Sequence, residues 1–152
     1  VAMGGDLEGD SAATPAFLVW AMADDSSAPL QRLQVIKGWV DSQGQSFERV
    51  YYVAWAGEDR LGAGKKLAAI GNTVNLETAT YTNSIGAPLL STVWRDPDFK
   101  TELSAFYYVR VIEIPTPRHA LADALALGMV KPDRGPAVIQ ERAYSSPIWY
   151  AP

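Results

Sequence analysis

Residues 105–114 read AFYYVRVIEI, the stretch that is most informative about the fold. Aromatic and β-branched side chains fit the pleated, packed surface of a sheet, so this stretch predicts a central β-strand. Two prolines, Pro115 and Pro117, end it, because proline has no backbone N–H to donate. Arg110 and Glu113 are an odd number of residues apart and therefore lie on opposite faces of this strand. A charged residue at Arg110 indicates a polar interface or exposure on an outer face.

The stretches on either side of 105–114 also read mostly as strands. Leu33, Val35 and Trp39 share one face of a segment whose other face carries further apolar residues, which is typical of a strand inside a sheet. Alternation over 47–55 predicts its hairpin partner, and β-branched residues over 73–82 predict an edge strand. A last, interrupted strand is expected over 138–150. Only 118–127 reads as a helix, with Gly128 placed to end it.

Short strands separated by turns, with almost no helix, favour a mainly β fold of two stacked antiparallel sheets. We therefore expect an antiparallel β-sandwich of immunoglobulin-like topology, with one short helix near 118–127. Residues 1–15 are rich in small and polar residues and are expected to be a flexible lead-in or linker. The single sandwich domain is expected to span 16–152.

Composition and charge exclude several classes of function. The 152 residues carry a formal net charge of −4 and no conspicuous cluster of Lys or Arg, so nucleic acid and anionic membrane surfaces are not expected partners. The apolar runs are too short for membrane insertion. With no cysteine and one histidine, the chain is not expected to hold a metal site or a cofactor by itself. Its first residues lack both an initiator Met and a signal peptide, so we expect a piece of a longer protein.

No group of residues predicts catalysis strongly. His119 and Asp123 are four apart on the expected helix, and Ser145 or Ser146 could act as a nucleophile, but a surface or capping histidine explains the same pattern. Four aspartates could supply oxygen ligands to calcium, although each pair lies in an expected turn; they are Asp24, Asp25, Asp96 and Asp98. Asp6 is flanked by glycine, which would let it approach a ligand closely, but a flexible linker shows the same pattern.

Aromatic residues are abundant, with 5 Trp and 7 Tyr. Most occupy alternating positions of expected strands, which favours core packing. Exposed aromatic side chains would instead indicate a surface that stacks on sugars or on a partner domain.

Six stretches together resemble one family pattern: IKGWVD at 36–41, VYYVAW at 50–55, TATYTNSIGA at 78–87, VWRDPDF at 93–99, FYYVRVIEIPTPR at 106–118 and IQERAYSSPIWY at 139–150. From about Met3 to Pro152 the chain resembles the C-terminal part of the bacterial domain-of-unknown-function 3604 family. The N-terminal part of that family is similar to metal-dependent hydrolases of the polymerase-and-histidinol-phosphatase type, and many members look exported.

The resemblance implies an accessory, non-catalytic sandwich that packs on the N-terminal domain of a parent hydrolase. A divalent metal would then belong to that parent domain, and the location would be periplasmic or extracellular. No catalytic residue is carried over, since the metal-binding motifs are absent, and His119 stands where many relatives have an aromatic residue. Residues expected at an interface or near a neighbouring site are Asp6, Arg110, Arg118, His119 and Trp149. The alternatives are a carbohydrate-binding module and a fragment that completes a neighbouring hydrolase active site; the oligomeric state is open.

Overall fold

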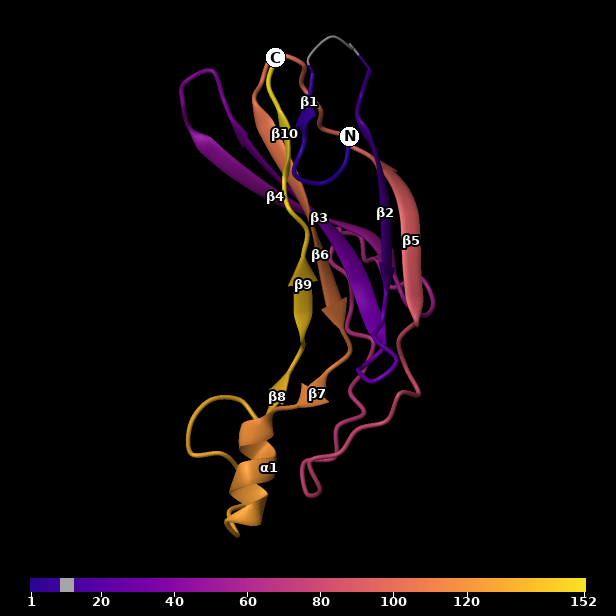
Figure 1. Ribbon diagram of the computed structural model, residues 1–152, viewed down its shortest axis with the longest axis vertical. Helices are drawn as coiled ribbons and strands as arrows, with labels where there is room; N and C mark the ends of the chain where they lie inside the picture. Colours follow the sequence, from indigo (N-terminus) through magenta and orange to yellow (C-terminus); the bar gives the residue numbers. More distant parts are fainter. Residues whose placement is uncertain (9–12) are drawn as a thin grey trace.

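The computed structural model describes residues 1–8 and 13–152 (Figure 1). The described chain is mainly β with one short helix, as the sequence predicted. Its elements are β1 (Asp6–Leu7), β2 (Ala16–Met22), β3 (Leu30–Val40), β4 (Ser46–Trp55), β5 (Leu89–Arg95), β6 (Ala105–Glu113), β7 (Thr116–Pro117), α1 (His119–Ala126), β8 (Val138–Ile139), β9 (Arg142–Tyr144) and β10 (Ile148–Tyr150).

A six-stranded sheet forms the larger layer, with strand order β1-β10-β6-β3-β4 and with β9 also paired to β6. The predicted hairpin is confirmed, since β3 and β4 are antiparallel and Val35 lies opposite Tyr51. The predicted central strand is also confirmed, because β6 pairs β3 along one edge and β9 and β10 along the other. A β-bulge at Gln31 interrupts the β3–β6 register near one end.

The expectation of antiparallel sheets needs one correction. β1 runs parallel to β10, with Asp6 opposite Trp149, so the large sheet is mixed. Backbone hydrogen bonds from Gly4 to Pro147 and from Trp149 to Gly5 hold this first segment against β10. Part of the expected lead-in is therefore sheet, while residues 9–12 of it lie outside the described residues. Immunoglobulin-like topology is not shown by this strand order, and the domain boundary at residue 16 stays a prediction.

The second layer is an antiparallel ribbon of β2 and β5 that covers one face of the large sheet (Figure 1). Val19 and Leu90 of the ribbon join Leu33, Val35 and Tyr107 of the large sheet in one buried cluster. Because strand side chains alternate, the same register points Leu18, Trp20 and Met22 away from that cluster. We call the face of the large sheet that packs on the ribbon the inner face, and the opposite one the outer face.

The ends of the elements follow local chemistry. Helix α1 follows Arg118, and Gly128 with a φ of +74° comes just after it, which confirms the predicted helix. The strand predicted over 73–82 is wrong: only a single bridge joins Asn75 to Thr80 there. The Asn75 side chain accepts hydrogen bonds from the following backbone, and such local bonds compete with strand pairing. No helix among the described residues has the length and apolar character needed to cross a bilayer.

Candidate functional site

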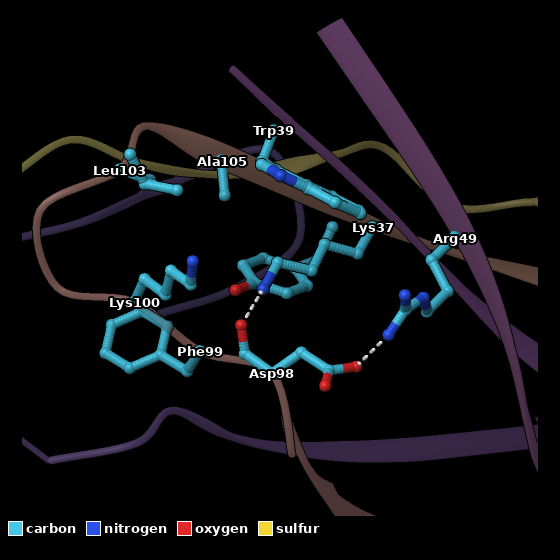
Figure 2. Close-up of a pocket in the computed structure, with 9 residues that line it drawn as sticks. Lys37, Trp39, Arg49, Asp98, Phe99, Lys100, Leu103 and Ala105 are labelled. Carbon is cyan, nitrogen blue, oxygen red and sulfur yellow. Dashed lines mark hydrogen bonds and ion pairs between the residues drawn. The ribbon is translucent and has the colours of Figure 1, made fainter. Parts of the chain in front are cut away.

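A small pocket opens at one end of the layered core, where the β5–β6 connection crosses the inner faces of β3 and β4 (Figure 2). Its volume is about 200 Å³. Three basic side chains and several aromatic ones surround it; the lining residues are Lys37, Trp39, Arg49, Asp98, Phe99, Lys100, Leu103, Ala105 and Tyr107. The combination of cations, a carboxylate and aromatic rings makes this pocket the first place to look for chemistry.

A buried ion pair lies beside this pocket. Lys37 follows Leu33 and Val35 on the inner face of β3, so its side chain enters the apolar layer, and the residue is only 4% exposed. The Nζ atom lies 2.5 Å from Asp96 Oδ2 and donates to the Asp98 carbonyl oxygen at 2.8 Å. The Tyr107 hydroxyl donates to the same Asp96 oxygen at 2.8 Å, and burial together with that bond raises the pKa of Tyr107. Asp96 is thus surrounded by donors.

A second pair lies at the more exposed rim. Arg49 Nη1 is 2.5 Å from Asp98 Oδ2, and the Tyr51 hydroxyl donates to the same oxygen at 2.6 Å. The hydrogen bond from Tyr51, with the Arg49 charge, holds the pKa of Asp98 below its ordinary value. Burial, followed by the bond to Asp98, raises the pKa of Tyr51. These contacts join the β5–β6 connection to β4. Because all three groups keep their usual charge states, none of them is ready to transfer a proton.

The pocket therefore has the features of a structural centre. Lys37 and Arg49 are both engaged by aspartates, whereas Lys100 makes no ion pair with any described residue. Its side chain points toward the pocket in Figure 2. Within residues 1–8 and 13–152, no three His, Asp or Glu side chains are grouped so as to hold a metal ion. The residues that line the pocket do not include a nucleophile paired with a base, and the pocket volume admits only a small polar molecule.

The candidate catalytic and calcium groups are not brought together. Asp24 and Asp25 follow β2, whereas Asp96 and Asp98 follow β5; since β2 and β5 are antiparallel, the two pairs lie at opposite ends of the ribbon. His119 begins α1 at the far end of the molecule from both chain termini (Figure 1). Ser145 instead lies beside Val109 in the middle of β6, where its hydroxyl accepts a bond from the Val109 N–H at 2.9 Å. These described residues therefore do not form a His119–Asp123–Ser145 triad.

Of the five residues expected at an interface, two lie near each end of the structure and one lies between the ends. Asp6 and Trp149 are neighbours across the β1–β10 pair and line one groove on the large sheet. Arg118 caps the start of α1 without a side-chain capping bond, and His119 next to it is exposed. Arg110 lies between them on the outer face, where its Nε donates to Gln34 Oε1 at 2.7 Å. Whether any of them contacts another domain stays a prediction.

Sequence reasoning missed two sets of residues. Lys37 could have been found, because a lysine in register with Leu33 and Val35 predicts a buried cation that needs an acidic partner. Arg32 and Arg142 could not have been found from the sequence, because only strand pairing brings them to the same region as Arg110.

The comparison with protein families gives one result. A family model described as a protein of unknown function (DUF3604) matches residues 1–152. No curated protein and no solved structure shows significant similarity to the chain. Since the family model spans the whole chain, the protein belongs to the DUF3604 family.

Proposed function

We propose that this chain is a non-catalytic accessory β-sandwich domain that packs on a neighbouring metal-dependent hydrolase domain of the same polypeptide. The observation that carries the proposal is the outer face of the β2–β5 ribbon. Leu18, Trp20 and Met22 on that face are 78%, 59% and 65% exposed. Their cross-strand neighbours include Val93 and Leu89, which are 64% and 42% exposed. We call these five residues the ribbon patch.

The ribbon patch has the properties of an interface. Its members are neighbours by register: Leu18 lies opposite Val93 and Met22 opposite Leu89, while Ser91 lies opposite Trp20, so the surface is mainly apolar. Soluble domains seldom expose such surfaces unless another surface covers them. The resemblance described above supplies the occupant, a hydrolase domain of the polymerase-and-histidinol-phosphatase type. The pocket supports a non-catalytic role as well, because Lys37 and Arg49 are paired with aspartates that hold the fold together.

The test compares Trp20→Ser in two settings, the 152-residue chain and the full polypeptide. In the chain alone, the exposed indole contacts little, so the free energy of unfolding should change by about 0.5 kcal/mol or less. In the full polypeptide, losing a buried interface aromatic should loosen the two domains by about 2 kcal/mol or more. Limited proteolysis between the domains and hydrogen exchange of β2 report that loosening.

Tyr144→Ser, an exposed aromatic on the other layer, is the matched control and should leave the domain contact intact. If the full polypeptide resists protease equally well with and without the Trp20→Ser substitution, packing through the ribbon patch is refuted.

The alternative in which the chain completes a neighbouring active site has a separate test. Asp6 lies in β1 and Arg118 precedes α1, and these two elements are at opposite ends of the molecule (Figure 1), so one neighbouring site could receive only one of them. Asp6→Asn and Arg118→Gln in the full polypeptide should leave kcat unchanged. A loss of kcat of about tenfold or more in either variant, with unchanged folding, would favour that alternative over an accessory role.

A further inference from the structure

Three arginines gather on the outer face of the large sheet. Gln34 of β3 lies opposite Arg110 of β6, which lies opposite Tyr144 of β9. In the next row, Arg32 lies opposite Ile112, which lies opposite Arg142. Side chains two residues apart on a strand share a face, and directly paired residues do too, so all these side chains lie on one face. We call Arg32, Arg110 and Arg142 the arginine cluster.

Neutral oxygens are the hydrogen-bond acceptors of this cluster. Arg110 Nε donates to Gln34 Oε1, and Arg142 donates from Nε and Nη2 to the Gln140 carbonyl oxygen at 3.3 and 3.1 Å. Arg32 Nη1 donates to the amide oxygen of Gln31, the residue of the β-bulge. No ion pair involves these arginines among the described residues. The positive charges are therefore held close together without a carboxylate.

In the described part of the chain, one donor of the cluster is left without an acceptor. The Nε atom of Arg32 is buried and has no hydrogen-bond partner among the described residues. Burial lowers the pKa of Arg32; the nearby Tyr52 opposes this shift, and repulsion from the neighbouring arginines adds to it, namely from Arg110, Arg60 and Arg142. A negatively charged group placed between these guanidinium groups would relieve the repulsion and accept charge-assisted hydrogen bonds.

A row of aromatic rings leads away from the cluster on the same face. Tyr144, opposite Arg110, is followed by Tyr108, Phe106 and Trp149. The successive ring centroids are 6.2, 6.3 and 5.3 Å apart, and the rings of Phe106 and Tyr108 are within 11° of parallel. Tyr144 and Trp149 at the two ends are 55% and 50% exposed. We call these four residues the aromatic row.

The far end of the aromatic row opens into a groove of about 940 Å³. Phe106 and Trp149 line it from the sheet, and Asp6, Glu8 and Glu48 supply carboxylates. Asp6 lies opposite Trp149 and Glu48 opposite Gly38, so both carboxylates border the same outer surface. Carboxylates repel a continuous chain of negative charge, but they accept hydrogen bonds from hydroxyl groups.

From this arrangement we infer that the outer face binds an anionic glycan. A uronate carboxylate or a sulfate ester binds the arginine cluster, the sugar rings pack on the aromatic row, and sugar hydroxyls donate to the carboxylates of the groove. The glycan that fits has neutral sugar units beside its charged one, whereas a single-stranded nucleic acid fits less well, because it has a phosphate at every nucleotide and some of these would meet the groove carboxylates on a chain of net charge −4. An acidic peptide meets the same repulsion. The site is on the layer opposite the ribbon patch, so it does not depend on the proposed packing.

Isothermal titration calorimetry of the 152-residue chain tests the inference with defined probes. These are a xylo-oligosaccharide with one glucuronate branch, a neutral oligosaccharide carrying one sulfate ester, neutral cellohexaose, poly-glutamate and a thymidine oligonucleotide. At least one anionic glycan should bind at low ionic strength, and added NaCl should weaken this binding, because salt screens surface charge pairs. The uronate and the sulfated probe separate the two sources of negative charge.

Arg142→Gln is the principal variant, since its side chain is exposed and its loss should leave the fold intact. It should weaken glycan binding about tenfold or more, the effect of losing a charge-assisted hydrogen bond. Arg110→Gln and Trp149→Ala should each weaken it too. Arg95→Gln, the same change on an exposed residue of the opposite layer, should leave the dissociation constant unchanged.

Four results would overturn the inference. These are no binding of either anionic glycan at millimolar concentration, equal binding of cellohexaose, equal affinity of Arg142→Gln and the unaltered chain, and tighter binding of poly-glutamate or the oligonucleotide. The last result would assign the cluster to an acidic protein or a nucleic acid instead. Thermal unfolding of each variant distinguishes a lost contact from a lost fold.

Discussion

At the residue scale, Lys37 is a charged residue at a position of β3 where the alternation of side chains predicts an apolar one. Taking an ammonium group out of water is costly unless a partner replaces the lost hydration. Asp96, 59 residues later in the chain, supplies the opposite charge, and the Asp98 carbonyl accepts a second hydrogen bond. The pair therefore joins β3 to the β5–β6 connection and fixes where that connection crosses the core.

The variant Asp96→Asn tests how strongly this pair is coupled to folding. Asparagine keeps the shape and an acceptor for Tyr107 but removes the negative charge, leaving Lys37 buried without compensation. The free energy of unfolding should fall by about 3 kcal/mol or more. The double variant Lys37→Met with Asp96→Asn should recover most of the loss, because no buried charge remains. Urea denaturation at neutral pH measures both.

Asp25→Asn, in an exposed turn, is the control and should alter the unfolding free energy by about 0.5 kcal/mol or less. A loss under about 1 kcal/mol for Asp96→Asn would mean that water enters the site and hydrates Lys37.

At the scale of elements, the contact between β3 and β6 is set by one glycine. Gly38 lies opposite Phe106, and the Phe106 ring lies over the glycine on the outer face. A Cβ atom on residue 38 would overlap the ring atoms. Glycine in a strand interior commonly marks such a close approach. Gly38 therefore lets Phe106 take its place between Trp149 and Tyr108 in the aromatic row.

Gly38→Ala should lower the free energy of unfolding by about 1–3 kcal/mol, since the Phe106 ring must leave its position in a packed row. The same substitution in a Phe106→Leu background should cost clearly less, because the smaller side chain leaves room for the methyl group. Thermal unfolding of the four chains in this cycle gives the coupling. Independent, additive effects of the two substitutions would show that the ring does not restrain residue 38.

At the scale of the whole molecule, the two layers share one core, while α1 stands apart from it. The buried cluster joins ribbon and large sheet through residues of β2, β3, β5, β6 and β10, and within the described part of the chain none of its members comes from α1. Leu121 and Ala124 are the buried residues of the helix. Few apolar contacts hold the helix, so its opening should require less free energy than unfolding of the sheets.

Native-state hydrogen exchange should therefore show α1 amides exchanging well before those of β3 and β6. The strands should exchange with a free energy close to that of global unfolding. Because α1 and the strands are followed in one experiment, the strands serve as the internal control. Protection of α1 equal to that of β3 would contradict this order and would indicate one cooperative unit that includes the helix.

Local patterns along the chain determined the mainly β class, the β3–β4 hairpin, the central strand at 105–114 and the single helix. These features depend on residues close in the chain, whose periodicity and turn chemistry are visible without a structure. The strand expected over 73–82 was wrong because asparagine side chains hold that segment in turns. The sequence could not show which of the five predicted interface residues lie close together, because their spacing along the chain does not reveal which strands pair.

Tertiary packing alone decided which distant residues meet. The parallel pairing of β1 with β10, the Lys37–Asp96 pair, and the arginine cluster all join segments far apart in the chain. Strand register is set by how whole faces are buried, and a shift of one residue moves every side chain to the other face. For this reason local sequence patterns determine which segments are strands, and the packing of the two layers determines which surfaces those strands create.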